Sequence, residues 1–201
     1  MSMRRRSLLL TGARALALLG VAALFAVLVY RIAGGNPGAG LVRAVAAHRA
    51  PATPDVRLAI IWRRSETWPP RLRGVLRHGT LSLHNLRGYP VVINFWASWC
   101  TPCERDAGLL TSAAEAQRGR VVFLAVDVHD YSSDARRFLS AHHVPFVAVR
   151  SGASVLGLFG LVGLPETFFI DRRGRIRGMT RGQLSTTSFR QQLAAVSRAA
   201  D

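Results

Sequence analysis

Lysine is absent from the 201 residues of this chain, and acidic residues are few. The 27 basic residues are therefore all arginine, and against 11 acidic residues they give a formal net charge of +16. Such an excess can favour binding to the phosphates of nucleic acids. The arginines are spread along the chain rather than gathered with interleaved aromatic residues. We therefore expect no nucleic-acid partner, but a general attraction to anionic lipid headgroups or acidic partners.

Cysteine is also scarce, because only Cys100 and Cys103 are present. A bridge across two intervening residues closes a very short loop, so a structural staple between distant segments is excluded. Structural zinc usually needs four ligands, and the adjacent His142 and His143 suit one metal ion poorly. We expect no resident metal and no separate cofactor, the working group being a redox-active disulfide. Delivery of Cu(I), which thiolates bind well, and an inert bridge stay open as alternatives.

One long apolar run is present, near the N-terminus. Residues 15–30 carry no charge, Arg31 closes the run, and Arg4–Arg6 precede it. Basic residues stay on the cytoplasmic side of a membrane span. We therefore expect a cytoplasmic N-terminus over residues 1–14 and a transmembrane anchor over residues 15–33.

This topology predicts a single-pass protein of the cell membrane, with its C-terminal domain on the extracytoplasmic face, periplasmic or extracellular. The alternative is a cleaved signal peptide, which has the same basic start and apolar middle. An A-x-A cleavage pattern occurs at Ala44-Val45-Ala46, well past the end of the apolar run. The domain is exported in either case.

Residues 34–56 are rich in glycine, alanine and proline and show no sustained period, which predicts a flexible linker. From residue 57 to residue 201 the pattern changes to alternating strand and helix signals. The expected strands are 58–62, 80–83, 91–96, 121–126, 146–149, 167–171 and 175–179. The expected helices are 104–117, 132–143, 153–159 and a closing helix from Ser185 or Ser188. This order predicts a mixed α/β sandwich, with parallel strand pairing first and antiparallel pairing last.

The two cysteines lie where a buried strand ends and a helix begins. A thiolate is the reactive form of cysteine, and the unpaired N–H groups of a helix N-terminus favour the anion. We expect Cys100 at the exposed helix end as the nucleophile. Cys103, one turn inward, would resolve the mixed disulfide, while Pro102 stiffens the turn between the sulfurs. Peroxidase chemistry is disfavoured, because Ala97 stands where a peroxidase would need threonine or serine.

Three motifs resemble the thioredoxin superfamily and, within it, the membrane-tethered TlpA/ResA/CcmG (DsbE) group. They occur in the family's order, and the resemblance extends over roughly residues 70–200. They are Leu86–Trp96 (LRGYPVVINFW), Trp96–Cys103 (WASWCTPC) and Gly163–Asp171 (GLPETFFID). The resemblance implies a thioredoxin-like three-layer α/β/α sandwich with a central mixed sheet, preceded by one N-terminal transmembrane helix.

The resemblance also implies roles for single residues. Pro165 would be a cis-proline facing the cysteines, the backbone of Leu164 would pair with an extended stretch of substrate, and Glu166 would lie near the active site. Asn94 stands at the position of ordinary thioredoxin's buried aspartate, so that acid cannot serve here. Trp99, with Thr101 and Pro102 between the cysteines, would contact the substrate.

Asp106 follows Cys103 by three residues, where the family usually has glutamate. Helical spacing of three places its carboxylate on the same side as Cys103, so it could transfer protons. It could equally be a first-turn acid that stabilises the helix dipole.

The resemblance implies a thiol–disulfide oxidoreductase that reduces disulfides of exported partners such as apocytochrome c or copper-site proteins, with electrons from a membrane thiol–disulfide donor. The main alternative is the reverse reaction, in which the enzyme oxidises thiols of exported proteins to disulfides. Direction depends on the reduction potential, which the Thr-Pro pair between the cysteines does not settle. A membrane-tethered copper-delivery module is the non-enzymatic alternative.

Overall fold

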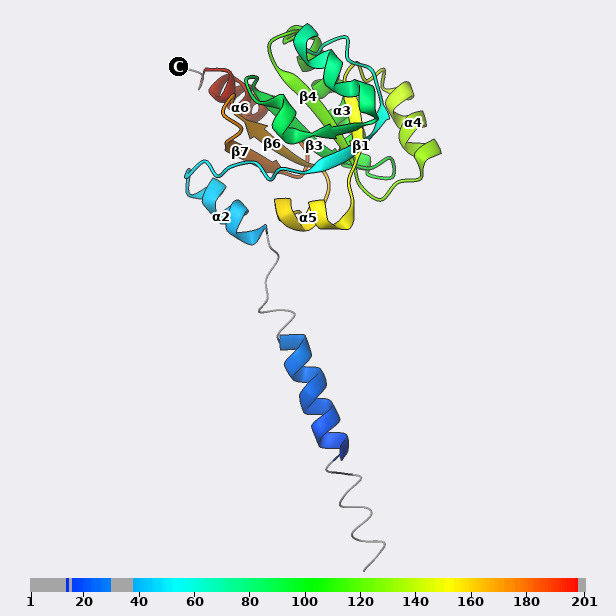
Figure 1. Cartoon of the computed structure of the whole chain (residues 1–201), viewed down its shortest axis with the longest axis vertical. Helices are drawn as coiled ribbons and strands as arrows, with labels where there is room; N and C mark the ends of the chain where they lie inside the picture. The colour runs from blue at the N-terminus through cyan, green and yellow to red at the C-terminus, as the bar shows by residue number, and fades with distance from the viewer. Residues whose placement is uncertain (1–13, 15, 30–37, 199–201) are drawn as a thin grey trace, which may run out of the picture. The chain divides into compact units, whose positions relative to one another are not determined.

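The computed structural model of the chain describes residue 14, residues 16–29 and residues 38–198 (Figure 1). The chain divides into two units, residues 1–36 and residues 37–201. In the first unit residues 16–29 form a helix whose side chains are exposed along its whole length. Within the described part of the chain, no helix has the length and apolarity required to cross a membrane. The predicted basic cluster Arg4–Arg6 lies outside the described residues.

The second unit is built on one mixed sheet of seven strands in the order β2-β1-β5-β4-β3-β6-β7. The three central strands β5, β4 and β3 run parallel, whereas β1, β2, β6 and β7 pair antiparallel at the two sides. The strands are β1 Arg57–Trp62, β2 Thr80–Ser82, β3 Val91–Trp96, β4 Val122–Asp127, β5 Val147–Arg150, β6 Glu166–Ile170 and β7 Ile176–Arg181.

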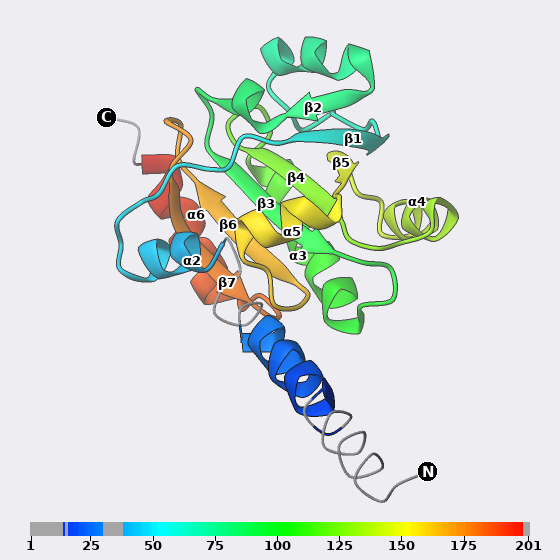
Figure 2. The ribbon, with the colours of Figure 1, turned by 60° about the horizontal axis from the view of Figure 1, so that its bottom comes forward.

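Helices cover both faces of this sheet. The helices are α2 Ala39–Ala46, α3 Thr101–Ala116, α4 Ser132–Ala141, α5 Ala153–Phe159 and α6 Thr186–Arg198, with 3₁₀ segments η1 Pro70–His78 and η2 Leu83–Leu86. On one face Phe169 of β6 packs against Phe189 of α6, and α3 lies on this same side. On the other face Phe159 of α5 packs against Phe95 and Phe168. In Figure 2 α5 crosses in front of the central strands.

The central strands form because most of their residues are β-branched or aromatic and because both faces of the sheet are covered here. All six residues of β3 (VVINFW) and all six of β4 (VFLAVD) are buried. Their in-register parallel pairing, from Val91 opposite Val122 to Trp96 opposite Asp127, brings the carboxyl ends of both strands to one edge. The functional residues gather at that edge.

The predicted thioredoxin-like α/β fold with a mixed sheet is confirmed, and the expected strands and helices are all present with ends shifted by a few residues. The predicted order of strand pairing is incomplete. Antiparallel pairing also occurs at the start of the chain, because β1 and β2 add to the far side of β5. The sequence pattern also missed η1 and η2, since 3₁₀ segments have no apolar period of 3.6.

Residues 34–56, predicted as a flexible linker, contain ordered structure from Gly38 onward. Helix α2 lies in this range, packs on α5 and β7, and buries Val45. Beyond it, the carbonyl of Pro51 accepts the N–H of Ile176, and the N–H of Thr53 donates to the carbonyl of Gly174. The glycine- and alanine-rich composition concealed this docking, because small residues permit close backbone contact as well as flexibility.

Candidate active site

The chain passes from β3 to α3 through Ala97, Ser98 and Trp99, and Cys100 is the N-cap of α3. The Sγ of Cys100 accepts a hydrogen bond from the backbone N–H of Cys103 at 3.3 Å. It therefore takes the place of the oxygen that usually caps a helix. Pro102 stands in the first turn, where its missing N–H costs nothing. The placement of the pair at the start of the helix agrees with the sequence prediction.

Cys100 and Cys103 form a disulfide, with Cα atoms 5.2 Å apart. The sequence predicted an exposed Cys100, but in this oxidised form it is only 5% exposed and Cys103 is 3% exposed. The bridge holds the Cys100 sulfur close to the first turn of α3, where the N–H of Cys103 reaches it. The exposed group at this position is its neighbour Trp99, of which 64% is accessible. Thr101 is exposed and Pro102 is half-buried.

Pro165 immediately precedes β6, and the Leu164–Pro165 peptide bond is cis, as the resemblance implied. In the antiparallel pairing of β3 with β6, Phe95 lies opposite Glu166. Pro165 therefore lies at the edge of the sheet where Trp96 ends β3 and the chain turns toward Cys100. Leu164, the residue expected to pair with substrate, is half-buried.

Glu166 is buried, but its side chain does not share a face with Cys103. Asn94 lines a small cavity together with Cys103, so its neighbour Phe95, and Glu166 opposite Phe95, face the α5 side. There Oε1 of Glu166 accepts the N–H of Val162 at 3.0 Å and lies 3.6 Å from Nε of Arg181. Burial raises the pKa of Glu166, and the Val162 bond and Arg181 oppose that rise.

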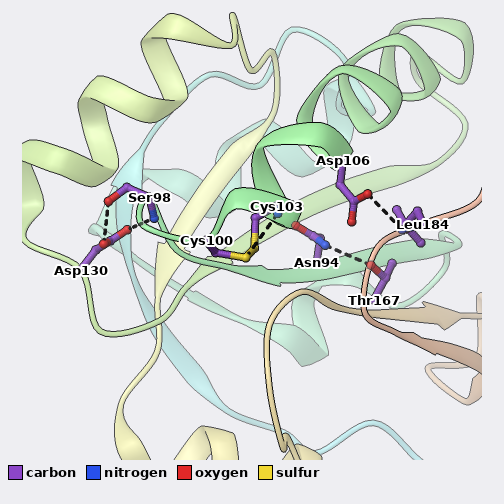
Figure 3. Close-up of a disulfide and its surroundings, with 8 residues drawn as sticks. All are labelled: Asn94, Ser98, Cys100, Cys103, Asp106, Asp130, Thr167 and Leu184. Carbon is purple, nitrogen blue, oxygen red and sulfur yellow. Dashed lines mark hydrogen bonds between the residues drawn. A yellow bond between two sulfur atoms is a disulfide. The ribbon is translucent and has the colours of Figure 1, made fainter.

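Asp106 is 1% exposed, and its Oδ1 accepts the N–H of Leu184 at 3.0 Å (Figure 3). Its Oδ2 has no partner among the described residues. Burial raises the pKa of Asp106 to about 6. This position is not that of an exposed first-turn acid, a role that Glu104 fills instead. Asp106 anchors the loop before α6, a contact that its sequence spacing could not reveal.

A polar pair lies behind Cys103. Nδ2 of Asn94 donates to Oγ1 of Thr167 at 3.0 Å, joining β3 to β6. The neighbouring Trp96 stacks on Phe138 with ring centroids 4.5 Å apart. The Trp96 Nε1–H is buried without a partner in the described part of the chain. The residue at position 94 is thus neutral and hydrogen-bonded.

The sequence reading missed a polar cluster on the other side of Cys100. Oδ2 of Asp130 accepts the backbone N–H of Ser98 at 2.6 Å, and Oδ1 accepts the Ser98 hydroxyl at 2.8 Å (Figure 3). Next to it, at the end of β4, Oδ2 of Asp127 accepts a hydrogen bond of 2.8 Å from Nε of Arg150 and lies 2.8 Å from Nη2 of the same side chain. Burial raises the pKa of Asp127 to about 6, which Arg150 opposes and Asp130 reinforces. The sequence signal that could have revealed this cluster was the pair of acids Asp127 and Asp130, at and just beyond the end of the buried strand β4.

No group of three or more metal-ligating side chains occurs in the described part of the chain. The groups that meet at this edge of the sheet are a disulfide at a helix N-terminus, a cis-proline beside it, and buried carboxyls on both sides. Such an arrangement can exchange its disulfide with thiols of another molecule, because Cys100 is held at the N–H groups that favour its thiolate.

Comparison with known proteins agrees with this geometry. Residues 71–179 match the AhpC/TSA family. The chain is 37% identical over 122 residues to the thiol:disulfide interchange protein DsbE of Pseudomonas fluorescens biotype C, covering 59% of this chain and 67% of that protein. It is 29% identical over 116 residues to the thiol-disulfide oxidoreductase ResA of Geobacillus thermodenitrificans, covering 57% and 67% respectively.

The chain belongs to the AhpC/TSA family. A crystal structure of a thioredoxin-family thiol:disulfide interchange protein from Chlorobium tepidum shares the fold, with a TM-score of 0.60 at 17% identity, covering 74% of this chain and 97% of that one. With its cysteine pair, the chain is a thiol–disulfide oxidoreductase of the DsbE/ResA type. The expected class of enzyme is confirmed.

Proposed function

We propose that this chain is a membrane-anchored, exported protein-disulfide reductase. The observation that carries this proposal is the Cys100–Cys103 disulfide at the start of α3, beside the cis-proline Pro165. Relatives that contain the matching region are named thiol:disulfide interchange protein and thiol-disulfide oxidoreductase.

In the proposed reaction the reduced Cys100 thiolate attacks one sulfur of a substrate disulfide. A Cys100–substrate mixed disulfide forms, and the other substrate sulfur leaves as a thiol. The Cys103 thiolate then attacks Cys100, releasing the second substrate thiol and forming the Cys100–Cys103 disulfide. The substrate gains two electrons and two protons, and an external dithiol restores the reduced enzyme by the reverse exchange. Asp106, one turn beyond Cys103, is the proposed proton acceptor for the Cys103 thiol.

The surroundings of Cys100 support the reducing direction. A strong oxidant owes its potential to a stabilised reduced form, above all to a stabilised thiolate. Among the described residues, the N–H of Cys103 is the one donor that reaches the Cys100 sulfur, and no cationic side chain does. Burial of Cys100 further disfavours the anion. We therefore expect the Cys100 thiolate to be only moderately stabilised and the Cys100–Cys103 pair to have a reducing potential.

A protein substrate is supported by the exposed apolar side chains of the second unit. The large exposed apolar residues described there are Trp99, Tyr131, Leu158 and Val162. Trp99 adjoins Cys100, Tyr131 follows the Asp130 that holds Ser98, and Val162 lies in the loop before Pro165. Apolar side chains gathered beside a reactive group suit docking of a polypeptide. Trp99, Thr101, Pro102 and Leu164 are the proposed substrate contacts.

Membrane anchoring is supported by the helix over residues 16–29. Its large apolar residues are strongly exposed, including Leu16, Leu19, Leu24 and Phe25. A helix that is apolar all round is stable when surrounded by lipid or protein, not water. Cleavage after Ala44-Val45-Ala46 would remove α2, whose Val45 belongs to the core. This favours an uncleaved anchor and an extracytoplasmic domain.

For partners, we propose disulfide-bearing exported proteins, with apocytochrome c awaiting haem and copper-site proteins as the first candidates. The electron donor would be a membrane thiol–disulfide protein. Both proposals follow from the family resemblance and from the proposed location, where disulfides form and must be reduced before haem or copper is inserted.

The full chain, purified in detergent, tests the direction by equilibration in glutathione buffers of known potential. A reductase is expected to give a potential of about −270 mV, as thioredoxin does. It should also reduce insulin disulfides in the presence of dithiothreitol, and Cys100→Ser should abolish this activity.

A potential of about −120 mV would instead make the chain a disulfide-forming oxidase. Stoichiometric Cu(I) binding without any insulin reduction or thiol oxidation would contradict both enzymatic directions and favour copper delivery. The variant Cys103→Ser, which retains the nucleophile, should accumulate a mixed disulfide with insulin chains.

A further inference from the structure

Helix α2 meets helix α5 through direct contact of two glycines. Gly38 caps the start of α2, and Gly160, in a left-handed conformation with φ +66°, ends α5. A Cβ on Gly38 would overlap the backbone nitrogen of Gly160 and lie 2.6 Å from the carbonyl oxygen of Gly157. A Cβ on Gly160 would lie 2.7 Å from the carbonyl oxygen of Gly38. The docking of α2 therefore requires glycine on both sides.

Gly160 is also connected to the buried acid beside the cis-proline. Nη2 of Arg181 donates to the carbonyl oxygen of Gly160 at 3.4 Å, and its Nε lies 3.6 Å from Oε1 of Glu166. The same Oε1 accepts the N–H of Val162. Contacts from α2, β6 and β7 thus converge on the few residues that follow α5.

These residues, 161–164, lead directly into the cis-proline, and we call them the substrate loop. The side chain of Val162 in its middle is 73% exposed, and the backbone of the loop is held by the bond from the Val162 N–H to Glu166. The shape of the loop therefore depends on how Gly160 and Glu166 are held at its two ends. One end is Gly160 against α2, and the other is Pro165 with Glu166. A shift of α2 would move the first end directly.

We propose that α2 is a positioning element for the substrate loop, so that its docking on Gly160 sets how well the enzyme binds polypeptide substrates. The proposal rests on the proposed function, because it assigns the loop to substrate binding. It does not involve the sulfur chemistry, since neither Gly38 nor Gly160 is in the cysteine motif. A change at the contact between α2 and Gly160 should therefore weaken the binding of polypeptides and leave exchange with small disulfides unaffected.

The variant Gly38→Ala tests this, because its methyl group must push α2 away from α5 backbone that cannot yield. In the full chain we expect KM for insulin to rise about five-fold. The rate of exchange with the small disulfide 5,5′-dithiobis(2-nitrobenzoic acid), which needs no peptide-binding loop, should stay unchanged. Gly40→Ala is the matched control, since Gly40 lies in the same helix with no atom within 4 Å of an added Cβ.

Two further measurements keep the proposal testable if Gly38→Ala folds poorly. Val42→Ala removes a side chain that lies against Gly160 and creates no overlap, and it should raise KM in the same direction. Combining Gly38→Ala with Glu166→Gln should give less than the sum of the two single effects on KM, because both act on one loop. Thermal unfolding of each variant reports folding separately.

Equal KM values for insulin in the wild type, Gly38→Ala and Val42→Ala would overturn the proposal. So would equal losses toward insulin and the small disulfide, because that result indicates general damage. A wild-type chain that exchanges with neither disulfide would contradict the proposed function itself, which is a distinguishable outcome.

Discussion

At the residue scale, Asp106 carries a buried carboxyl that holds the loop before α6 through the N–H of Leu184. Its pKa of about 6 in the folded chain lies above the value of about 3.9 for an unfolded aspartate. A raised pKa means that the folded state binds the proton more tightly. The stability this provides is fully present below about pH 4 and is lost as the pH rises through about 6.

The variant Asp106→Asn should therefore change the pH dependence of stability. Asparagine keeps an oxygen for the Leu184 N–H but carries no charge. We expect a flatter free energy of unfolding between pH 4 and pH 6, and at pH 8 a gain of about 1 kcal/mol. Urea unfolding of the oxidised chain at several pH values measures this. Asp106→Ala is the matched control, and it should lose about 1–3 kcal/mol because the N–H is left unpaired.

The same Asp106→Asn variant tests proton transfer. If Asp106 accepts the Cys103 proton, the rate of insulin reduction should fall several-fold and lose an inflection near pH 6. An unchanged pH profile would restrict Asp106 to anchoring the loop.

Cys100 is subject to two opposing effects on its thiol pKa. The N-terminus of α3 lowers it and burial raises it. Because the Cys103 N–H reaches the Cys100 sulfur directly, we expect the helix to dominate. In Cys103→Ser, the rate of alkylation by iodoacetamide should show an inflection at a pH below the ordinary thiol pKa of about 8.5. In Cys100→Ser, Cys103 should react far more slowly. A Cys100 that resists alkylation after reduction would contradict the enzymatic interpretation.

At the scale of elements, the connection from β3 to α3 is held from outside by the loop after β4. Asp130 binds both the N–H and the hydroxyl of Ser98, two residues before Cys100. Asp130→Ala should lower the free energy of unfolding by about 2 kcal/mol, because an N–H loses a charged acceptor. It should also slow exchange with the small disulfide, since Cys100 is less well placed.

Ser98→Ala keeps the backbone bond and should cost less, about 1 kcal/mol or below. The control is Asp134→Ala on α4, an acid whose ion pair with the exposed Arg137 contributes little. Equal effects of Asp130→Ala and Asp134→Ala, measured by urea unfolding and exchange rate, would contradict this role for Asp130.

The sequence was informative for elements with strong local signals. The runs VVINFW and VFLAVD are apolar apart from Asn94 and the final Asp127, and both became fully buried strands. Helix α2 was missed because its eight residues (AGLVRAVA) are mostly alanine, glycine and valine, a composition that is also typical of a linker. Its order comes from contacts with α5 and β7, which lie more than a hundred residues later in the chain. The Asp130–Ser98 bond was missed for the same reason, since it joins two loops.

At the scale of the whole molecule, the proposed anchor would place the apolar helix over residues 16–29 in lipid. Leu24→Arg places a charge in the middle of the apolar helix, at a cost of about 3 kcal/mol for membrane insertion. After expression in bacterial cells, the share of chain that stays in the membrane pellet at alkaline pH should fall several-fold. Gly40→Arg, which adds the same charge to the exposed side of α2, should remain in the pellet. A wild-type chain released by alkali would contradict the anchor.

The cysteine spacing predicted the reactive pair before the fold was known, and the family resemblance predicted the cis-proline. The resemblance has limits at single residues. It could not place Glu166, whose side chain faces α5 rather than Cys103 because strand residues alternate between the faces of a sheet. It could not predict burial of Cys100 either, since a sequence motif does not show which parts of the fold pack around the sulfur.

The backbone bonds of Pro51 and Thr53 to the β6–β7 hairpin have a practical consequence for fragment design. A truncated protein starting at residue 57, where the strand pattern begins, would lack those bonds and would expose the surface that Val45 covers. The backbone groups of Gly174 and Ile176 would then lack their partners, and unpaired backbone and exposed apolar surface both promote aggregation. Recombinant fragments intended for crystals or assays should therefore begin at or before Pro37.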